Sequence, residues 1–196
     1  HYSGLMYFGR EALDGFKIPV FVMPRMLSFL KNNGPWSQLS NLENIDLIPL
    51  KNNISLNITS NLSVVPFEVP HRDEFSETVG YKIIGPNKSA LFIPDINKWE
   101  LWNRDIVNEV MSVDYAFLDA TFFQDGEINR PMSEIPHPFI TETLKLFENE
   151  SREVKNKIYF IHFNHTNISL QVNNPVIDSI ANLGYNFTRF GDQLSL

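Results

Sequence analysis

The chain is built from short apolar runs, and the spacing between these runs changes partway along the sequence. In the first half the runs follow one another across short polar turns, and the alternation of Ile54, Leu56 and Ile58 is typical of a half-buried antiparallel strand. In the second half, apolar runs alternate with segments of helical periodicity. A mixed sheet followed by strand–helix units predicts an α/β layered fold.

The predicted strands are 18–23, 45–50, 54–59, 62–69, 78–84, 89–93, 115–118 and 157–161. Four helices are predicted: one from Pro24 through Lys31, one whose face carries Trp99, Trp102, Ile106 and Val110, one with Pro138 at its first position, and one over 174–183 that Gly184 ends. We expect Trp99 and Trp102 to lie in the core rather than on a stacking surface.

Composition excludes several classes of function. The 196 residues, 43% of them apolar, fit one core, and we expect a single domain over residues 1–196. A net charge of −7 without a basic run makes nucleic acid an unlikely partner. The chain has no cysteine, which excludes thiolate zinc sites and cysteine nucleophiles. No apolar stretch approaches the roughly 18–20 residues of a membrane span.

Four residues with metal-binding side chains come at the ends of predicted strands. They are His71, Asp95, Asp119 and His162. Open α/β sheets bind their ligands at strand ends. Neutral imidazole and carboxylate suit zinc, iron or manganese, and a carboxylate can bridge two such ions. Each residue by itself could be a solvent-facing loop residue, but four together favour a metal site.

His162 and His165 compete for the last of these positions. The strand period of two places them on opposite faces, so that only one of them reaches the strand end. We favour His162 because it follows the apolar run directly. His137 stands before Pro138, near the start of a predicted helix, where it could donate or accept a proton. The alternative for His137 is a capping residue without a catalytic part.

These residues resemble motifs of the metallo-β-lactamase superfamily. The segment that begins with His1 resembles the end of its His-x-His-x-(Asp/Gly)-His motif, with His1 as the last histidine. His71 with Gly80-Tyr81 resembles the next metal histidine, in the form used by the transfer-RNA 3′-processing endonuclease branch. Asp95 corresponds to the bridging aspartate and His162 to the final metal histidine.

Two further elements extend the resemblance. Asp119-Ala120-Thr121-Phe122 is similar to the Glu-Ala-Thr-Phe element of the endonuclease branch, and His137 falls where that branch keeps its catalytic histidine. The pyrroloquinoline-quinone biosynthesis protein B family is closer still. Its Asp-Gly-Thr-Phe-Phe and His-x-Asn-x-Thr-Asn-Pro patterns resemble the segments that begin at Asp119 and His162, and the similarity extends through nearly the whole chain.

The resemblance implies a four-layer αββα sandwich whose N-terminal strands are missing from this chain, so that the single domain is N-terminally truncated. It also implies a metal-dependent hydrolase that acts on a small-molecule substrate through metal-activated water or oxygen. One or two divalent ions are expected, with zinc first and iron or manganese as alternatives. The implied metal ligands are His1, His71, Asp95 and His162.

The implied catalytic residues are His137, which would protonate the leaving group, and Asp119, which would orient His137. Two other functions compete with this interpretation. A phosphodiesterase or RNase Z-like nuclease would need a basic groove or an RNA-clamping arm, and we find neither in the sequence. A non-catalytic binding module would keep only a relic metal site. The sequence leaves the oligomeric state open, and the localisation is cytoplasmic or, if a signal peptide preceded this chain, periplasmic or secreted.

Overall fold

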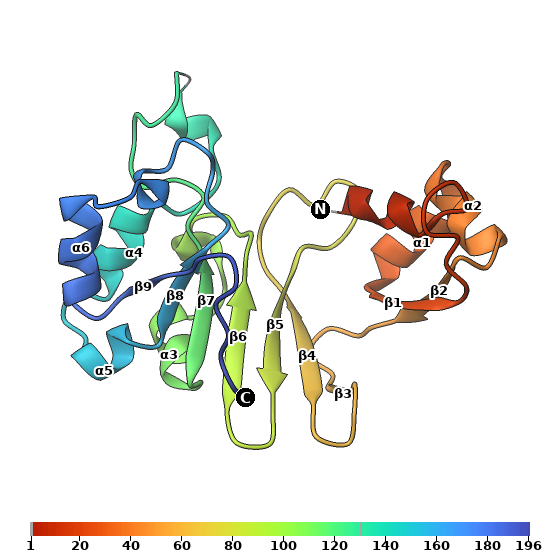
Figure 1. Cartoon of the computed structure of the whole chain (residues 1–196), viewed down its shortest axis with the longest axis horizontal. Helices are drawn as coiled ribbons and strands as arrows, with labels where there is room; N and C mark the ends of the chain where they lie inside the picture. The colour runs from red at the N-terminus through yellow and green to blue at the C-terminus, as the bar shows by residue number, and fades with distance from the viewer. Residues whose placement is uncertain (1, 130) are drawn as a thin grey trace. The chain divides into compact units, whose positions relative to one another are not determined.

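The computed structural model describes residues 2–129 and 131–196, which form two compact units (Figure 1). The first unit runs to Ile54 and includes residues 72–77, and the second comprises 55–71 and 78–196. None of the helices in the described residues is long and apolar enough to cross a membrane.

The first unit is a two-stranded sheet with short helices. Its elements are η1 (Tyr2–Phe8), β1 (Ile18–Val22), α1 (Pro24–Asn32), α2 (Trp36–Asn41) and β2 (Ile45–Pro49). β1 and β2 pair in parallel, and Val22, Leu30, Leu39, Ile45 and Leu47 form the buried core. The carboxylate of Glu77 accepts hydrogen bonds from the backbone N–H groups of Arg25 and Met26, which begin α1. Donors of this kind have no partner within the helix.

The second unit contains a seven-stranded sheet whose strands lie in chain order. They are β3 (Leu56–Asn57), β4 (Ser63–Glu68), β5 (Val79–Ile84), β6 (Ser89–Ile93), β7 (Tyr115–Asp119), β8 (Ile158–Ile161) and β9 (Asn186–Phe187). Pairing is antiparallel from β3 to β6 and parallel from β6 to β9. The predicted α/β class, with a strand-rich part followed by alternating strands and helices, is confirmed.

The helical segments of this unit lie between the strands or follow them. They are η2 (Trp99–Leu101), α3 (Ile106–Met111), η3 (Met132–Glu134), α4 (Ile140–Leu146), α5 (Arg152–Lys155), η4 (Ile168–Leu170) and α6 (Pro175–Asn182). Residues from α3, α4 and α6 share one buried cluster with alternate residues of the central strands, among them Leu91, Leu118 and Phe160.

Two predicted helix boundaries are wrong, and capping explains both. The segment from Trp99 to Val110 is not one helix, because Trp102 is extended and the side chain of Asp105 accepts the N–H of Asn108 to begin α3 anew. Both tryptophans are nevertheless buried, as predicted.

The helix predicted to begin at Pro138 begins at Ile140. The side chain of Glu142 accepts the backbone N–H of Phe139 at 2.8 Å. This bond fixes the first turn of the helix, which therefore begins two residues later than predicted. The predicted strand over 54–59 is reduced to the two residues of β3. The remaining predicted strands are found within one or two residues of their expected ends.

The parallel strands bring the candidate residues to one edge of the sheet. Ile93 of β6 pairs with Leu118 of β7, and Asp119 pairs with Ile161 of β8. These three neighbouring strands therefore end side by side, as Figure 1 shows. Chain segments that leave them can meet at this edge, which is where open α/β sheets bind ligands.

Gly80 of β5 gives a test of the packing under this edge. A Cβ there would lie 2.5 and 2.6 Å from two ring carbons of Phe67, which is 1% exposed, and 3.1 Å from Cγ1 of Ile93. We expect Gly80→Ala to lower the free energy of unfolding by about 1–3 kcal/mol through overpacking, measured by urea denaturation. Gly4→Ala is the control, because a Cβ at Gly4 meets nothing within 4 Å. Equal stability of both variants would contradict this packing.

Candidate metal centre

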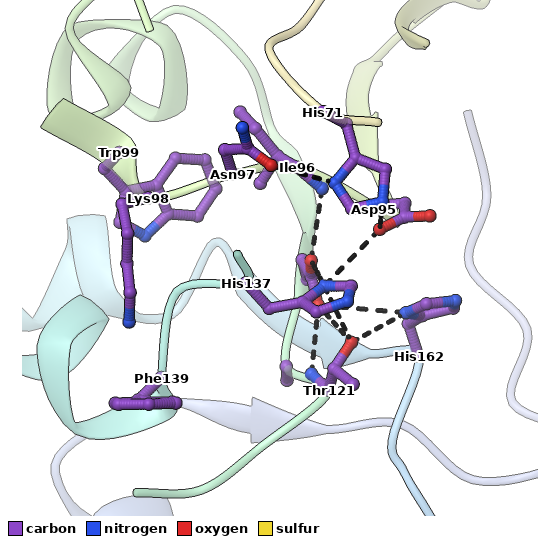
Figure 2. A network of polar contacts seen from close by, with 12 residues as sticks. His71, Asp95, Ile96, Asn97, Lys98, Trp99, Thr121, His137, Phe139 and His162 are labelled. Carbon is purple, nitrogen blue, oxygen red and sulfur yellow. Dashed lines mark hydrogen bonds and ion pairs between the residues drawn. The ribbon is translucent and has the colours of Figure 1, made fainter. Parts of the chain in front are cut away.

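Four acidic and histidine side chains converge at the carboxyl ends of the parallel strands. Asp95, Asp119, His137 and His162 each offer one ligand atom, and these atoms lie within 4.8 Å of one another. Asp95 and His162 follow β6 and β8, Asp119 is the last residue of β7, and His137 lies in the segment before α4. Figure 2 shows His71, Asp95, His137 and His162 pointing toward one another. All of these residues were predicted for the site from the sequence.

Asp119 lies at the centre of the hydrogen-bond network and is fully buried. Its Oδ1 accepts the backbone N–H of Thr121 at 2.9 Å and the hydroxyl of Thr121 at 2.7 Å. Its Oδ2 lies 2.8 Å from Nδ1 of His137 and 3.2 Å from the backbone N of Ile96. Burial by itself raises the pKa of Asp119, but the hydrogen bonds from His137 and Thr121 and the interaction with His162 outweigh it, and the pKa lies below its ordinary value. The carboxylate is therefore held ionised.

His71 is held between Asn97 and Asp95. Its Nδ1 lies 3.1 Å from Oδ1 of Asn97, and its Nε2 lies 2.9 Å from Oδ1 of Asp95. Burial lowers the pKa of His71, but the hydrogen bond and charge of Asp95 outweigh burial, and the net shift is upward. Because the amide oxygen of Asn97 can only accept, Nδ1 carries a hydrogen, and because the Asp95 carboxylate also accepts, Nε2 carries a second hydrogen in this geometry. The bond to Asn97 is typical of a metal-binding histidine, in which the nitrogen that does not face the metal is anchored.

His137 lies between the other two histidines. Its ring centroid is 5.2 Å from that of His71 and 6.1 Å from that of His162. Its Nδ1 is 2.8 Å from Oδ2 of Asp119 and 3.4 Å from Oδ1 of Asp95. The side chain is 15% exposed. It is therefore oriented by a buried carboxylate and remains accessible from solvent.

His162 follows β8 directly and adopts a left-handed backbone conformation, with φ 65°. Such a conformation is uncommon for a residue with a Cβ and is found at constrained sites. Its Nδ1 lies 2.8 Å from the hydroxyl oxygen of Thr121 and 3.8 Å from Oδ1 of Asp119. The interaction with Asp119 raises the pKa of His162, and burial opposes it. His165 is exposed and lies outside the cluster.

A second hydrogen-bond network ties the loop after β8 to the loop after β7. Glu127 accepts the backbone N–H of Phe123 and the hydroxyl of Thr166, both at 2.6 Å. The backbone N–H of Asn164 donates to the carbonyl of Thr121, and the buried side chain of Asn167 donates to the carbonyls of Ala120 and Thr121. These contacts fix the loop that carries His162.

Sequence reasoning missed several residues of the centre. Asn97, Thr121 and Glu127 contact the site residues or the loops that carry them, but neutral side chains and a loop carboxylate gave no signal of metal binding. Thr121 did stand inside the motif that begins at Asp119. The predicted ligand His1 lies outside the described residues.

The donor set fits a divalent metal ion. Zinc bonds to nitrogen and oxygen are about 2.0–2.2 Å long, so ligands of one ion lie within roughly 4.4 Å of one another. Nε2 of His71 and Oδ1 of Asp95 are 2.9 Å apart, within this limit, and the ligand atoms of Asp95 and His162 belong to a cluster that spreads over 4.8 Å. Imidazole and carboxylate without thiolate match zinc, iron or manganese.

Comparisons with known proteins show the family and the fold of the chain. A family model described as a beta-lactamase superfamily domain matches residues 1–163. Zinc-bound PqqB from Methylobacterium extorquens is 18% identical with a TM-score of 0.76, over 99% of this chain and 69% of that one. The metallo-β-lactamase fold is therefore confirmed. No curated protein matches the sequence.

Two further solved structures are similar at a TM-score of 0.55. One is a diphosphatase of the PhnP family, which is 16% identical over 96% of this chain and 62% of that one. The other is the metallo-β-lactamase fold protein YhfI from Bacillus subtilis, which is 11% identical over 96% of this chain and 67% of that one. The chain thus spans about two thirds of the length of these proteins.

The neighbouring histidines His162 and His165 give a matched test of the centre. We expect Zn²⁺ to raise the midpoint of thermal unfolding, because a ligand at 100 times its Kd stabilises the folded state by about 2.7 kcal/mol. His162→Ala should remove most of this shift, since His162 lies in the cluster. His165→Ala should keep it, since His165 is exposed. Equal shifts in the two variants, measured by differential scanning calorimetry, would exclude His162 from the centre.

Proposed function

The chain belongs to the beta-lactamase superfamily, and from this we propose that it is a metal-dependent hydrolase of a small-molecule substrate, similar to pyrroloquinoline-quinone biosynthesis protein B. The observation that carries the proposal is that Asp95, Asp119, His137 and His162 converge at the carboxyl ends of parallel strands, with His71 2.9 Å from Asp95, so that proposed ligands and a proposed proton-transfer pair lie together. We further propose that the two compact units belong to a single domain, because the family match runs through the first unit and into the second.

We propose that His71, Asp95 and His162 are metal ligands, together with His1. The side chains of His71, Asp95 and His162 are partly exposed, at 11%, 18% and 29%, so each is open on one side. We propose Asp95 for the bridging position that the resemblance implies; its Oδ1 lies 2.9 Å from Nε2 of the proposed ligand His71 and 3.4 Å from Nδ1 of the proposed proton donor His137. We expect zinc, since nitrogen and oxygen ligands in this combination favour it.

Asp119 is better suited to orienting His137 than to holding a metal. An ionised carboxylate has about four acceptor sites, and Asp119 receives Ile96 N–H, Thr121 N–H, the Thr121 hydroxyl and His137 Nδ1. Its acceptor capacity is therefore taken up by donors within the protein. The hydrogen bond from Nδ1 leaves Nε2 of His137 as the atom that can give or take a proton.

These roles together describe hydrolysis. When bound, a divalent ion supplies a nucleophile by lowering the pKa of its water toward neutrality. His137, oriented by Asp119 at 2.8 Å, would donate a proton to the leaving group from Nε2. The proposed ligands and the proposed proton donor lie within one small volume, so that attack and protonation would occur on the same bound substrate.

The charges near the centre favour a small molecule rather than a nucleic acid as the substrate. Lys98 follows the Asp95 segment, but its ammonium lies 2.6 Å from Oε2 of Glu142 and 3.6 Å from the Phe139 ring centroid. With the net charge of −7, this pairing leaves little to attract a phosphate backbone. A phosphodiesterase that acts on small diesters is the second candidate, because a diphosphatase is among the similar structures.

His137→Ala separates the catalytic role from a ligand role. We expect the zinc-loaded variant to keep its zinc and to lose about 10²–10⁴-fold in turnover, because only the proton donor is removed. The assays are zinc analysis by mass spectrometry and hydrolysis of p-nitrophenyl acetate and bis(p-nitrophenyl) phosphate. Activity on the diester alone would favour the phosphodiesterase.

His165→Ala is the matched control and should keep both zinc and activity. Loss of zinc from His137→Ala, in parallel with loss of activity, would make His137 a ligand and contradict the assignment. Absence of zinc and of both activities from the unaltered protein would overturn the proposed function itself.

A further inference from the structure

We infer that Thr121 is a positioning residue: its hydroxyl accepts a hydrogen bond from Nδ1 of His162 and so presents Nε2 of His162 to the metal. The inference rests on the proposed function, because it concerns the same site. The ligand atom of His162 is then Nε2, and Thr121 is the residue that selects this atom. Figure 2 shows Thr121 beside both His137 and His162.

The direction of the Thr121 hydroxyl follows from its neighbour Asp119. Both carboxylate oxygens of Asp119 face backbone N–H groups, from Thr121 at 2.9 Å and from Ile96 at 3.2 Å, so the carboxylate acts as an acceptor. The hydroxyl oxygen of Thr121 lies 2.7 Å from Oδ1 of Asp119. A hydroxyl has one hydrogen, and here that hydrogen points to the carboxylate.

His162 must therefore be the donor in its bond with Thr121. Once the hydroxyl hydrogen is used, the oxygen has only lone pairs for the Nδ1 of His162 at 2.8 Å. Nδ1 then carries a hydrogen, and in the neutral ring Nε2 is the nitrogen without a hydrogen. Anchoring one nitrogen in this way fixes both the tautomer and the orientation of a metal-binding imidazole.

His137 does not compete for the same acceptor. Its Nδ1 lies 3.3 Å from the Thr121 hydroxyl but 2.8 Å from Oδ2 of Asp119. The shorter contact with the charged acceptor takes the His137 hydrogen. One carboxylate thus orients His137 directly and His162 through the hydroxyl of Thr121.

The backbone of Thr121 is held firmly enough for this role. Its N–H donates to Asp119, and its carbonyl accepts the N–H of Asn164 at 2.9 Å and the side chain of Asn167 at 3.2 Å. The residue is only 9% exposed. The two segments that carry Thr121 and His162 are therefore joined at several points, and the hydroxyl meets Nδ1 in a fixed geometry.

The first test is a direct measurement of the tautomer. Long-range ¹H–¹⁵N correlation spectra of protein labelled at histidine distinguish a protonated Nδ1 from a protonated Nε2. We expect the Nδ1–H form for His162, both in metal-free protein at alkaline pH, where the ring is neutral, and with zinc. The Nε2–H form in either state would overturn the inference.

The second test compares two substitutions of Thr121. Thr121→Val keeps the shape and removes the hydroxyl, whereas Thr121→Ser keeps the hydroxyl. We expect Thr121→Val to weaken binding of Co²⁺ by about 10–100-fold and to alter its visible absorption spectrum, as loss of an anchoring partner does. Thr121→Ser should bind Co²⁺ within a few-fold of the unaltered protein and keep the spectrum.

Circular dichroism of the metal-free variants shows whether each one is folded, and so distinguishes a loss of histidine positioning from a loss of folding. If Thr121→Val and Thr121→Ser lose Co²⁺ affinity equally, or Thr121→Val binds with unchanged affinity and spectrum, the hydroxyl has no positioning role. Failure of the unaltered protein to bind Co²⁺ or Zn²⁺ would instead contradict the proposed function. In that case the tautomer of His162 in the metal-free protein would still decide the direction of its hydrogen bond with Thr121.

Discussion

The whole centre depends on one buried charge, the carboxylate of Asp119 at the end of β7. An ionised group that is removed from water costs several kcal/mol unless protein donors replace the lost hydration. The donors come from three separate segments, through Ile96, Thr121 and His137. Because one buried carboxylate needs these hydrogen-bond donors, it joins the turn after β6, the turn after β7 and the segment before α4. The same contacts that stabilise the charge also arrange the chemical groups of the site.

The parallel part of the sheet decides where this carboxylate lies. β6, β7 and β8 are neighbours in register, so their carboxyl ends form one edge, and the turns that follow carry Asp95, Thr121 and His162. The strands beneath are rigid because their inward residues are fully buried, as Leu118 and Phe160 are. Functional turns on a rigid frame keep their geometry without needing regular structure of their own. This is why a left-handed residue such as His162 persists at the end of a strand.

Sequence reasoning succeeded where a residue's place follows from local pattern. Continuous apolar runs predict β6, β7 and β8, and the strand-end positions of Asp95, Asp119 and His162 follow from where these runs stop. It failed where two local patterns compete. Trp99 and Trp102 satisfy a helical spacing, but they pack in the main hydrophobic cluster with their indole N–H groups donating to Thr143 and Glu68 on distant segments, and no continuous helix runs from Trp99 to Val110. Spacing alone does not show which contact determines the position of a side chain.

The missed residues of the site illustrate the same limit, with one instructive exception. Asn97 contacts His71 and Glu127 contacts Thr166, and the members of each pair come close together only on folding. Thr121 also meets His162, 41 residues away, but its bond to Asp119 is local. A side-chain carboxylate accepts readily from the backbone two residues later, which is the spacing of Asp119 and Thr121. That turn places the Thr121 hydroxyl on the same oxygen. The Asp-Ala-Thr segment therefore contains the local half of the arrangement, and the parallel strand β8 supplies the histidine that completes it.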